Sequence, residues 1–342
     1  MSTAAENRIA KWDNAKALLI LLVVTGHGLF DLLKASETYR AVYLFIYLFH
    51  MPLFMFISGL LLKHTVRTGH RLKQRVVGYL ILGFLLKFLI LIERLLFGFY
   101  DYKQFYMWHE NSVPWYLLVL AAYLLLTHCL RNMSGRFLLL LAVIFGCLAG
   151  YDKAIGSLFS ISRFFVYYPF FLIGTYWDPE KTEPASAKYL WKAASAALLV
   201  TVFLFVFYNI NVLYPFIDLI KGGTSYPSLK PVIRTANVHL CGFYRLLYYC
   251  IAVLLSAAVV ILLPSRLHIF TYIGAHTLPV YMFHRPIQLA VVYFRAVEYM
   301  ITASDVRLQI LYILSAIVIT LIFSHPSLSR TETWFWRQLK EL

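Results

Sequence analysis

Three histidines fall inside long apolar stretches of the sequence. His27 follows the apolar run that begins at Lys16, His50 stands two residues before Pro52, and His284 precedes another proline. An ionisable group at the centre of a membrane helix costs at least about 2.5–3.5 kcal/mol, so such groups usually have a function. A buried imidazole can take a proton from a hydroxyl and act as a general base. We therefore treat these histidines as candidate catalytic residues, the alternative being hydrogen bonds between packed helices.

Lys16 and His27 are eleven residues apart. This spacing is close to three helical turns, so both side chains should project from one face, about 16 Å apart along the axis. Lys16 is then expected at the inner membrane surface and His27 near mid-membrane. Gly26 and Gly28 flank His27 and allow a helix or a substrate to approach closely. Lys16 is equally suited to anchoring the helix at the membrane surface.

Other polar side chains share these apolar segments. Tyr281 lies one turn before His284 and His276 two turns before it, so a continuous helix would place them on one face. Arg163 falls near the outer end of its segment, where it either holds a substrate or anchors the helix.

Several chemistries are not supported by the sequence. It has no HExxH motif, no Cys/His spacing typical of zinc and no serine elbow, so we expect neither a metal site nor a serine hydrolase. Asp31, Glu93 and Asp218 fall at the ends of segments or in loops, which argues against a proton-coupled carrier. The four cysteines lie in or beside apolar segments and predict no disulfide framework.

The composition excludes a soluble protein. Of 342 residues, 61% are hydrophobic and 14% are charged, against about 45–50% and roughly 25% in soluble domains. The net charge of +15 does not indicate nucleic-acid binding, because no basic cluster sits on a soluble module. Basic loops that face anionic lipid explain it better.

A membrane-spanning helix needs about 20 apolar residues, and this length gives about ten candidate segments. The sequence therefore predicts an all-α, polytopic helical bundle. The first segment is too long for the core of a signal peptide and is expected to be a permanent membrane helix. The segments are Lys16–Leu33, Ala41–Leu62, Val76–Phe97, Val113–Leu130, Phe137–Gly150, Arg163–Trp177, Tyr189–Asn209, Gly242–Leu263, Phe270–Phe294 and Val306–Phe323.

The connections between segments predict the topology. The strongly basic stretch Lys63–Arg75 and the basic tail would lie inside if both termini do, which favours N-in and C-in. The longest outside connection runs from Ile210 to about Cys241 and is expected either to cap the outer face or to be a flexible linker. Residues 327–342 mix aromatic and charged side chains and predict an interfacial amphipathic helix. We expect one membrane domain over residues 1–342.

Four stretches, in this order, resemble the acyltransferase-3 family of integral-membrane acyltransferases. They are Lys16–His27, Phe49–Gly59, Tyr168–Gly174 and Gly274–His284. The resemblance covers most of the chain and is nearest to the branch that is similar to fucose 4-O-acetylases.

The resemblance implies roles for individual residues. His27 matches the family's catalytic histidine, and Lys16 stands where most members have Arg, keeping the charge without the planar fork. Trp115 falls where the family tends to keep an aromatic residue. Arg71, Lys73 and Arg75 match a region that resembles a clamp for the phosphates of coenzyme A.

These observations predict a membrane O-acyltransferase, most simply an O-acetyltransferase of the inner or plasma membrane. Cytoplasmic acetyl-CoA, or another acyl-CoA, would donate the acyl group to a hydroxyl of a polysaccharide, glycolipid or other sugar acceptor. His27 would be the general base, and His50, His284 or Lys16 would stabilise the oxyanion. The expected ligand contacts are Lys16, Arg71, Lys73 and Arg75 for the cofactor, and Arg163, Trp115, Tyr281 and His276 for the acceptor.

Two other functions remain open at this point. A transporter or flippase of a small polar solute or lipid-linked sugar would use the same polar groups to line a cavity without chemistry. The other alternative is a membrane-anchored scaffold, a hypothesis that the buried polar groups disfavour. The sequence leaves the acceptor, the acyl-chain length and any homo-oligomer undecided.

Overall fold

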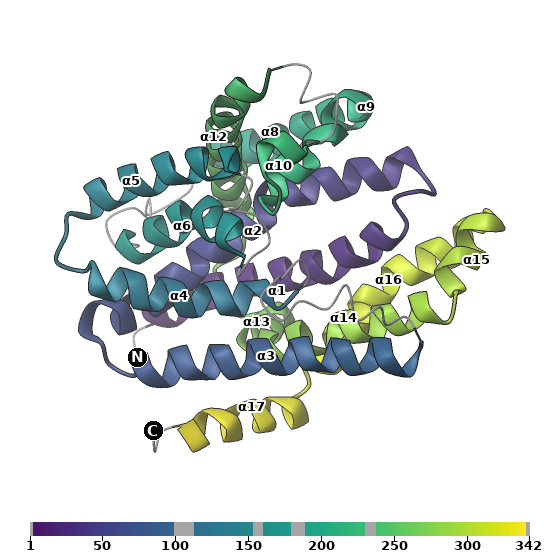
Figure 1. The fold of residues 1–342 in the computed structure, drawn as a ribbon. Coiled ribbons are helices and arrows are strands. Elements are labelled where there is room, and N and C mark those ends of the chain that lie inside the picture. Colours follow the sequence, from purple (N-terminus) through teal and green to yellow (C-terminus); the bar gives the residue numbers. More distant parts are fainter. Residues whose placement is uncertain (1–2, 99–112, 153–159, 179–188, 230–236, 340–342) are drawn as a thin grey trace.

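The computed structural model describes residues 3–98, 113–152, 160–178, 189–229 and 237–339, leaving aside the side chains of residues 3–9, 269 and 329. Within these ranges every regular element is a helix, which confirms the predicted all-α bundle (Figure 1). The α-helices are α1 Thr3–Asp31, α2 Glu37–Thr68, α3 Leu72–Leu96, α4 Trp115–Cys129, α5 Gly135–Leu148, α6 Ile161–Tyr176, α8 Tyr189–Tyr208, α9 Ile210–Leu213, α10 Ile217–Lys221, α12 Cys241–Leu262, α13 Ile269–Ala275, α14 Thr277–Tyr293, α15 Ala296–Thr302, α16 Val306–Phe323 and α17 Pro326–Gln338.

Each predicted apolar segment is helical over most of its length. In the described part of the chain, six stretches are long and apolar enough to cross a membrane: Ala10–Asp31, Glu37–Thr68, Leu72–Leu96, Tyr189–Tyr208, Val238–Leu262 and Val306–Phe323. Large apolar side chains on the outside of α3, α8 and α16 are exposed, as expected of surfaces that face lipid. The protein is therefore a membrane protein.

One predicted segment differs from the structure. The stretch Phe270–Phe294 is not a single helix, because the backbone breaks at His276, where φ is −124° and ψ is 45°. Gly274, just before the break, lies against the backbone of Asp13, so α13 and α1 approach too closely for a side chain. Because of this break, His276 does not share a helix face with Tyr281 and His284.

Both ends of the described chain lie at one end of the bundle (Figure 1). We call it the basic end, and it also holds the turn from Thr68 to Leu72 between α2 and α3. The opposite end holds the connection from α1 to α2. This arrangement is compatible with the predicted topology, while the side that faces the cytoplasm stays a prediction.

Two glycines hold α2 and α6 in direct backbone contact. A Cβ at Gly59 would collide with the carbonyl oxygen of Phe171, and a Cβ at Gly174 would collide with that of Phe56. Small residues at such crossings let membrane helices approach closely, and these two helices form the most extensive helix pair of the bundle. The pair fixes the position of His50, on α2, relative to Arg163, on α6.

The predicted interfacial tail is the amphipathic helix α17. Trp336 and Leu339 lie where a Cβ at Gly78 of α3 would stand, and the Trp336 ring packs edge-on against Tyr79 at 5.6 Å. The tail thus covers part of α3 at the basic end, while residues 340–342 lie outside the described residues.

Candidate active site

The three candidate catalytic histidines come together from three helices. His27 on α1 and His284 on α14 have ring centroids 5.3 Å apart. His50 on α2 lies within electrostatic range of His27. The residues are separated widely in the sequence, so the fold creates this cluster.

Hydrogen bonds determine which ring nitrogen of two histidines carries the proton. Nδ1 of His284 lies 3.1 Å from the carbonyl oxygen of Val280 and 2.9 Å from that of Tyr281. Nδ1 of His50 lies 2.8 Å from the carbonyl oxygen of Ile46. Because a carbonyl can only accept, Nδ1 donates in both rings and Nε2 keeps its lone pair when the ring is neutral. Nε2 of His284 is buried without a partner.

His27 differs from the other two histidines in its exposure. It is half-buried and makes no hydrogen bond with the described residues, whereas His50 and His284 are 3% and 0% exposed. The charged groups that act on His27 include Arg285 and Lys221. His27 is thus the histidine best placed to meet a substrate, in surroundings that favour negative charge.

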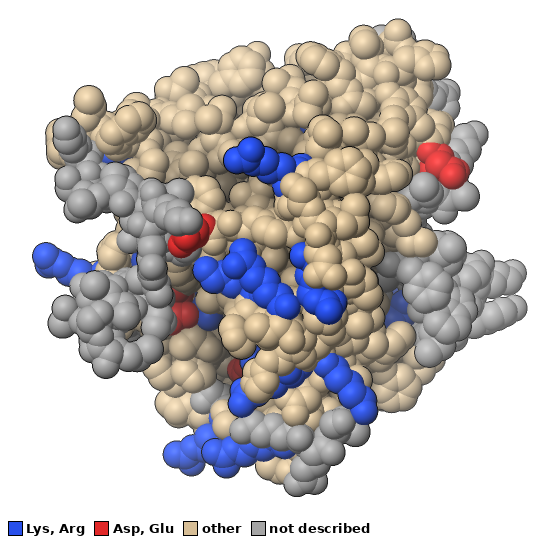
Figure 2. Space-filling model, turned by 90° about the vertical axis from the view of Figure 1, so that its left-hand side faces the viewer, with Lys and Arg blue, Asp and Glu red and all other residues tan. Residues whose placement is uncertain are grey.

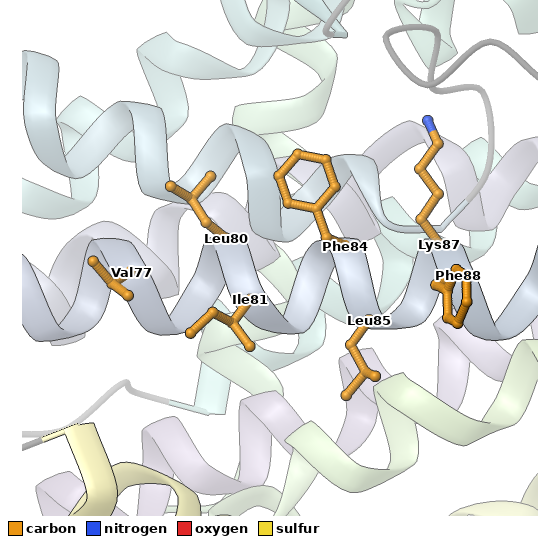
Figure 3. Close-up of a pocket in the computed structure, with 7 residues that line it drawn as sticks. All are labelled: Val77, Leu80, Ile81, Phe84, Leu85, Lys87 and Phe88. Carbon is orange, nitrogen blue, oxygen red and sulfur yellow. The ribbon is translucent and has the colours of Figure 1, made fainter.

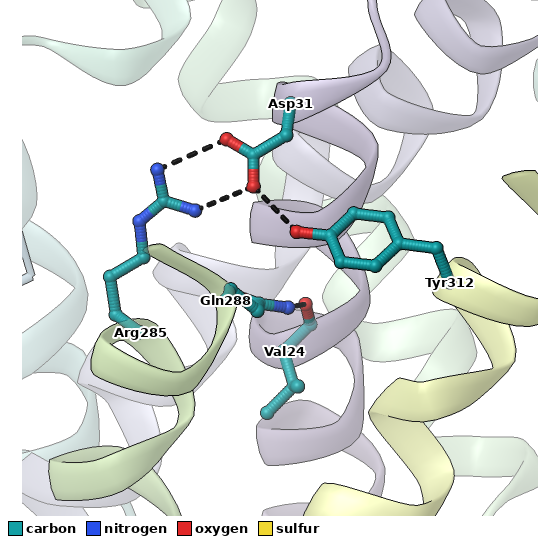
Figure 4. A network of polar contacts seen from close by, with 5 residues as sticks. All are labelled: Val24, Asp31, Arg285, Gln288 and Tyr312. Atoms are coloured by element: carbon teal, nitrogen blue, oxygen red, sulfur yellow. Dashed lines mark hydrogen bonds and ion pairs between the residues drawn. The ribbon is translucent and has the colours of Figure 1, made fainter. Parts of the chain in front are cut away.

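A polar network joins α1 to α14 beside the histidines (Figure 4). Arg285 donates to both carboxylate oxygens of Asp31, at 2.8 and 3.1 Å, and Tyr312 donates to the same carboxylate at 2.8 Å. The amide of Gln288 donates to the carbonyl oxygen of Val24 at 2.8 Å. These contacts lie on the helical turns next to His27 and His284, so they align the two rings.

In the sequence, Asp31 falls at the end of an apolar segment, and its partner Arg285 lies 254 residues further on. Two signals were available: Asp31 stands one turn after His27, and Arg285 follows His284 directly. Their contact depends on how two distant segments pack, which neither signal specifies.

Tyr281 belongs to the histidine cluster, as its spacing predicts. Its ring lies 6.0 Å from that of His284 and 5.5 Å from that of Tyr116. The Tyr281 hydroxyl donates to the carbonyl oxygen of Val113, which ties α14 to the start of α4. His276 lies elsewhere, at the basic end, because of the helix break.

Arg163 and Trp115, both predicted to contact the acceptor, lie together. The guanidinium of Arg163 is 5.2 Å from the centre of the Trp115 ring, and that ring is stacked on Tyr167 at 5.4 Å. Arg163 is only 8% exposed. With these neighbours, Trp115 supports the arginine rather than offering a free face to a sugar.

The predicted cofactor residues lie at the basic end. Lys16 pairs with Asp13 at 2.9 Å. Arg71, exposed, and Arg75, half-buried, stand one turn apart at the start of α3, while Lys73 points to another side of the helix. The Arg75 guanidinium lies 4.6 Å from the centre of the Trp336 ring.

Figure 2 shows this end of the molecule, where Lys and Arg side chains gather across the middle of the face and few acidic ones are visible. Glu332 of α17 lies within electrostatic range of Lys16, Arg75 and His276. Lys16, Arg75 and His276 therefore lie near α17. The positive charge of this surface suits a polyanion.

A groove of about 590 Å³ runs along the outside of α3 (Figure 3). Its lining is apolar except for the amine of Lys87, and it includes no residue of the histidine cluster. The lining residues are Val77, Leu80, Ile81, Phe84, Leu85, Lys87 and Phe88.

Comparison with known proteins gives the family. The family model for an acyltransferase domain, Acyl_transf_3, matches residues 9–325. The chain belongs to the acyltransferase-3 family. This acyltransferase is also similar to "Nodulation protein NolL" of Sinorhizobium fredii, with 42% identity over 72 residues, which is 19% of this chain and 19% of that protein. No solved structure matches it.

Proposed function

We propose that this acyltransferase moves an acetyl or other acyl group from acyl-CoA to a hydroxyl of a cell-envelope carbohydrate, in the inner or plasma membrane. The proposal is based on the histidine cluster. In it the ring centroid of half-buried His27 lies 5.3 Å from that of the fully buried His284. A surface suited to an anionic donor lies at the basic end of the same bundle. Because the chain belongs to a family of acyltransferases, we assign acyl transfer to these groups.

The donor would bind at the basic end. Arg71 and Arg75 stand one turn apart and can contact neighbouring phosphates, and Lys16, like Arg75, lies within electrostatic range of Glu332. Lys73 points elsewhere and would contribute less. The thioester arm must then extend between the helices towards His27.

The chemistry assigned to His27 is general-base catalysis. A ring nitrogen of His27 takes the hydroxyl proton as the oxygen of the acceptor attacks the thioester carbonyl carbon. When the carbon–sulfur bond breaks, the sulfur leaves with the bonding electrons and His27 returns the proton to it. Nε2 of His284 can accept a hydrogen bond from the His27 ring and so orient it.

The charge on the carbonyl oxygen needs a stabilising group. Neutral His50 and His284 present lone pairs at Nε2, so they are acceptors and not donors in that state. Of the cations that act on His27, Lys221 suits this role better than the sequence candidates, because Arg285 is paired with Asp31. Lys16 belongs to the basic end.

The test uses the full-length protein in liposomes with radiolabelled acetyl-CoA and a panel of glycans. We expect His27→Ala to reduce transfer about 10²–10⁴-fold, the usual contribution of a general base. His325→Ala, which changes an exposed histidine at the start of α17, is the control and should leave transfer unchanged. Undiminished transfer by the His27 variant would exclude His27 as the base.

The donor site has its own test. We expect the double substitution Arg71→Gln and Arg75→Gln to raise the KM for acetyl-CoA with little change in kcat. The matched control removes Arg131 and Arg136, two other arginines at the same end. Equal effects of both double substitutions would mean that the basic end attracts the donor only by its overall charge.

A further inference from the structure

Tyr47 on α2 lies beside the histidine cluster and has no role in the general-base step. Its ring packs edge-on against that of His50, with the two centroids 4.5 Å apart. Tyr47 is half-buried, as His27 is, whereas Tyr43 and His50, its neighbours one turn away on α2, are 1% and 3% exposed. Part of the Tyr47 side chain is therefore accessible where its neighbours are not.

The hydroxyl end of the Tyr47 ring lies against the helix that carries His27. A Cβ at Gly26 would lie 3.3 Å from Cε2 of Tyr47, and Cε2 is bonded to the carbon that bears the hydroxyl. Gly26 directly precedes His27 on α1. Because Gly26 has no side chain, the Tyr47 ring can approach the turn of α1 from which His27 projects.

Four helices meet around Tyr47. It lies within electrostatic range of Arg163 on α6, and of both Arg285 and Asp31, the pair that joins α14 to α1. These helices and α2 also carry the three histidines of the cluster. A substrate that reaches His27 would therefore pass close to the Tyr47 side chain.

The reacting carbonyl oxygen needs a hydrogen-bond donor near His27. Once the acceptor oxygen has bonded to the carbonyl carbon, only that carbon separates it from the carbonyl oxygen. Nε2 of His50 and of His284 cannot donate when these rings are neutral, and Arg285 already donates to Asp31. A tyrosine hydroxyl keeps its proton at neutral pH and is one of the side-chain donors that form oxyanion holes.

Tyr43 can hold the Tyr47 hydroxyl in a donating orientation. The two residues stand one turn apart on α2 with ring centroids at 4.1 Å, and their hydroxyl groups interact. A hydroxyl can accept one hydrogen bond while it donates another, so Tyr43 can donate to Tyr47 and leave the Tyr47 proton for a substrate. Hydrogen bonds in such a chain polarise and strengthen one another.

From this arrangement we propose that the Tyr47 hydroxyl donates a hydrogen bond to the thioester carbonyl oxygen as negative charge develops on it. The proposal rests on the proposed function, because it adds a catalytic residue to the same acyl transfer. Lys221 can act on the same oxygen by its charge, whereas the hydrogen bond from Tyr47 would also fix the position of the oxygen.

Tyr47 keeps its proton throughout this reaction. As the acceptor oxygen bonds to the carbonyl carbon and His27 takes its proton, the π electron pair of the carbonyl moves onto the carbonyl oxygen, where Tyr47 stabilises it. The pair then re-forms the carbonyl bond and the carbon–sulfur bond breaks. The sulfur leaves with the bonding electrons and receives the proton from His27.

The experiment removes or tunes the Tyr47 hydroxyl while the ring keeps its place. Wild-type protein, Tyr47→Phe, Tyr43→Phe and the control Tyr208→Phe, an exposed tyrosine at the end of α8, are compared in liposomes with acetyl-CoA. Both transfer to the glycan panel and hydrolysis of acetyl-CoA without a sugar are measured. Water replaces the acceptor hydroxyl in the hydrolysis, so this measurement does not depend on the identity of the acceptor.

We expect Tyr47→Phe to lower kcat about 10²–10³-fold, the usual effect of losing one oxyanion donor, with the KM for acetyl-CoA nearly unchanged. Tyr43→Phe should lower kcat about two- to tenfold, the weight of one neutral hydrogen bond. Tyr208→Phe should change neither constant.

A pH profile separates a donor from a residue that only packs. In a second protein, 3,5-difluorotyrosine replaces Tyr47, which makes the phenol more acidic and keeps the ring. A donor must be protonated, so kcat should fall as the pH rises through the ionisation of this hydroxyl, and the fluorinated protein should show the fall at lower pH. Tyr47→Phe should lack this part of the profile.

Three results would overturn the inference. Full activity of Tyr47→Phe, in a protein that still requires His27, would do so while leaving the proposed function intact. An effect confined to KM, or a fluorinated protein whose alkaline limb stays in place, would assign Tyr47 to binding or packing instead. Wild-type protein that neither transfers the acetyl group nor hydrolyses acetyl-CoA would reject the proposed function and this inference together.

Discussion

Arg285 on α14 donates two hydrogen bonds to the carboxylate of Asp31 on α1, at 2.8 and 3.1 Å. Two parallel bonds fix the angle of the guanidinium as well as its distance. The neighbouring turns carry His284 and His27, whose ring separation of 5.3 Å therefore depends on this pair. Asp31 and Arg285 are positioning residues for the histidine cluster.

Breaking this pair should destabilise the fold. Asp31→Asn leaves the Arg285 guanidinium buried without its counter-charge, and we expect a loss of about 3–5 kcal/mol in the free energy of unfolding. Asp13→Asn is the matched control, because Asp13 and Lys16 are more exposed, at 16% and 18%, and the expected loss is below about 1 kcal/mol. Chemical unfolding in detergent micelles measures both, and equal losses would contradict the positioning role.

His284 should act through His27. We expect His284→Ala to lower kcat at least about tenfold, by less than His27→Ala, whose loss should be about 10²–10⁴-fold. The double variant should lose no more than His27→Ala alone, because residues that act as a unit have non-additive effects. Single-turnover acyl transfer provides the measurement, and multiplicative losses would show that the histidines act independently.

The contact between α2 and α6 should tolerate no added methyl group. Gly59→Ala or Gly174→Ala drives a Cβ into a carbonyl group of the facing backbone, and we expect each to cost about 1–3 kcal/mol or more. Gly28→Ala is the control, since its Cβ would meet Nε2 of Gln288 at an ordinary 3.4 Å, and the gain in helix propensity is up to about 1 kcal/mol. A thermal shift of the same size in all three variants would argue against this contact.

The attachment of α17 should depend on pH. Burial raises the pKa of the Glu332 carboxyl, while His276, Lys16 and Arg75 act in the opposite direction. A carboxyl whose pKa is higher in the folded state binds its proton more tightly there. Stability is therefore greatest below the ordinary value of about 4.3 and falls as the pH rises from there through the raised pKa.

Glu332→Gln should remove this part of the pH dependence and stabilise the protein at neutral pH. Thermal unfolding from pH 4 to 8 checks the expectation, with Glu37→Gln, an exposed glutamate at the start of α2, as the control. A second series in the His276→Gln background separates the titration of His276 from that of Glu332. An unchanged slope in Glu332→Gln would assign the pH dependence to another group.

Hydropathy was sufficient to predict the apolar helices, because a membrane span needs a long apolar segment whatever its neighbours are. It failed at His276, where α13 ends and α14 starts: Pro279, in the first turn of α14, has no N–H, and in a continuous helix its ring would clash with the carbonyl group of Ala275. Periodicity counts residues along one uninterrupted helix and therefore gives the wrong face across such a break. His276 consequently lies at the basic end and not beside Tyr281.

The histidine cluster could be nominated from chemistry alone, since each of its members is an ionisable group in an apolar segment. Asp31, Arg285 and Lys221 could not be placed in the same way. Asp31 and Lys221 are the last residues of their helices, where charged residues are common and carry little information, and Arg285 lies in the middle of α14. Only the packing of α1, α10 and α14 pairs Asp31 with Arg285 and brings Arg285 and Lys221 within electrostatic range of His27.

The contact of α2 with α6 makes these two helices a single unit, because the backbone of each lies against a glycine of the other. This unit carries His50 and Arg163, whereas α1 and α14 carry His27 and His284. Tyr47 stands at their boundary, where a Cβ at Gly26 would lie 3.3 Å from its ring. A change at Gly59 or Gly174 would therefore displace His50 and Arg163 together, although neither glycine contacts either residue.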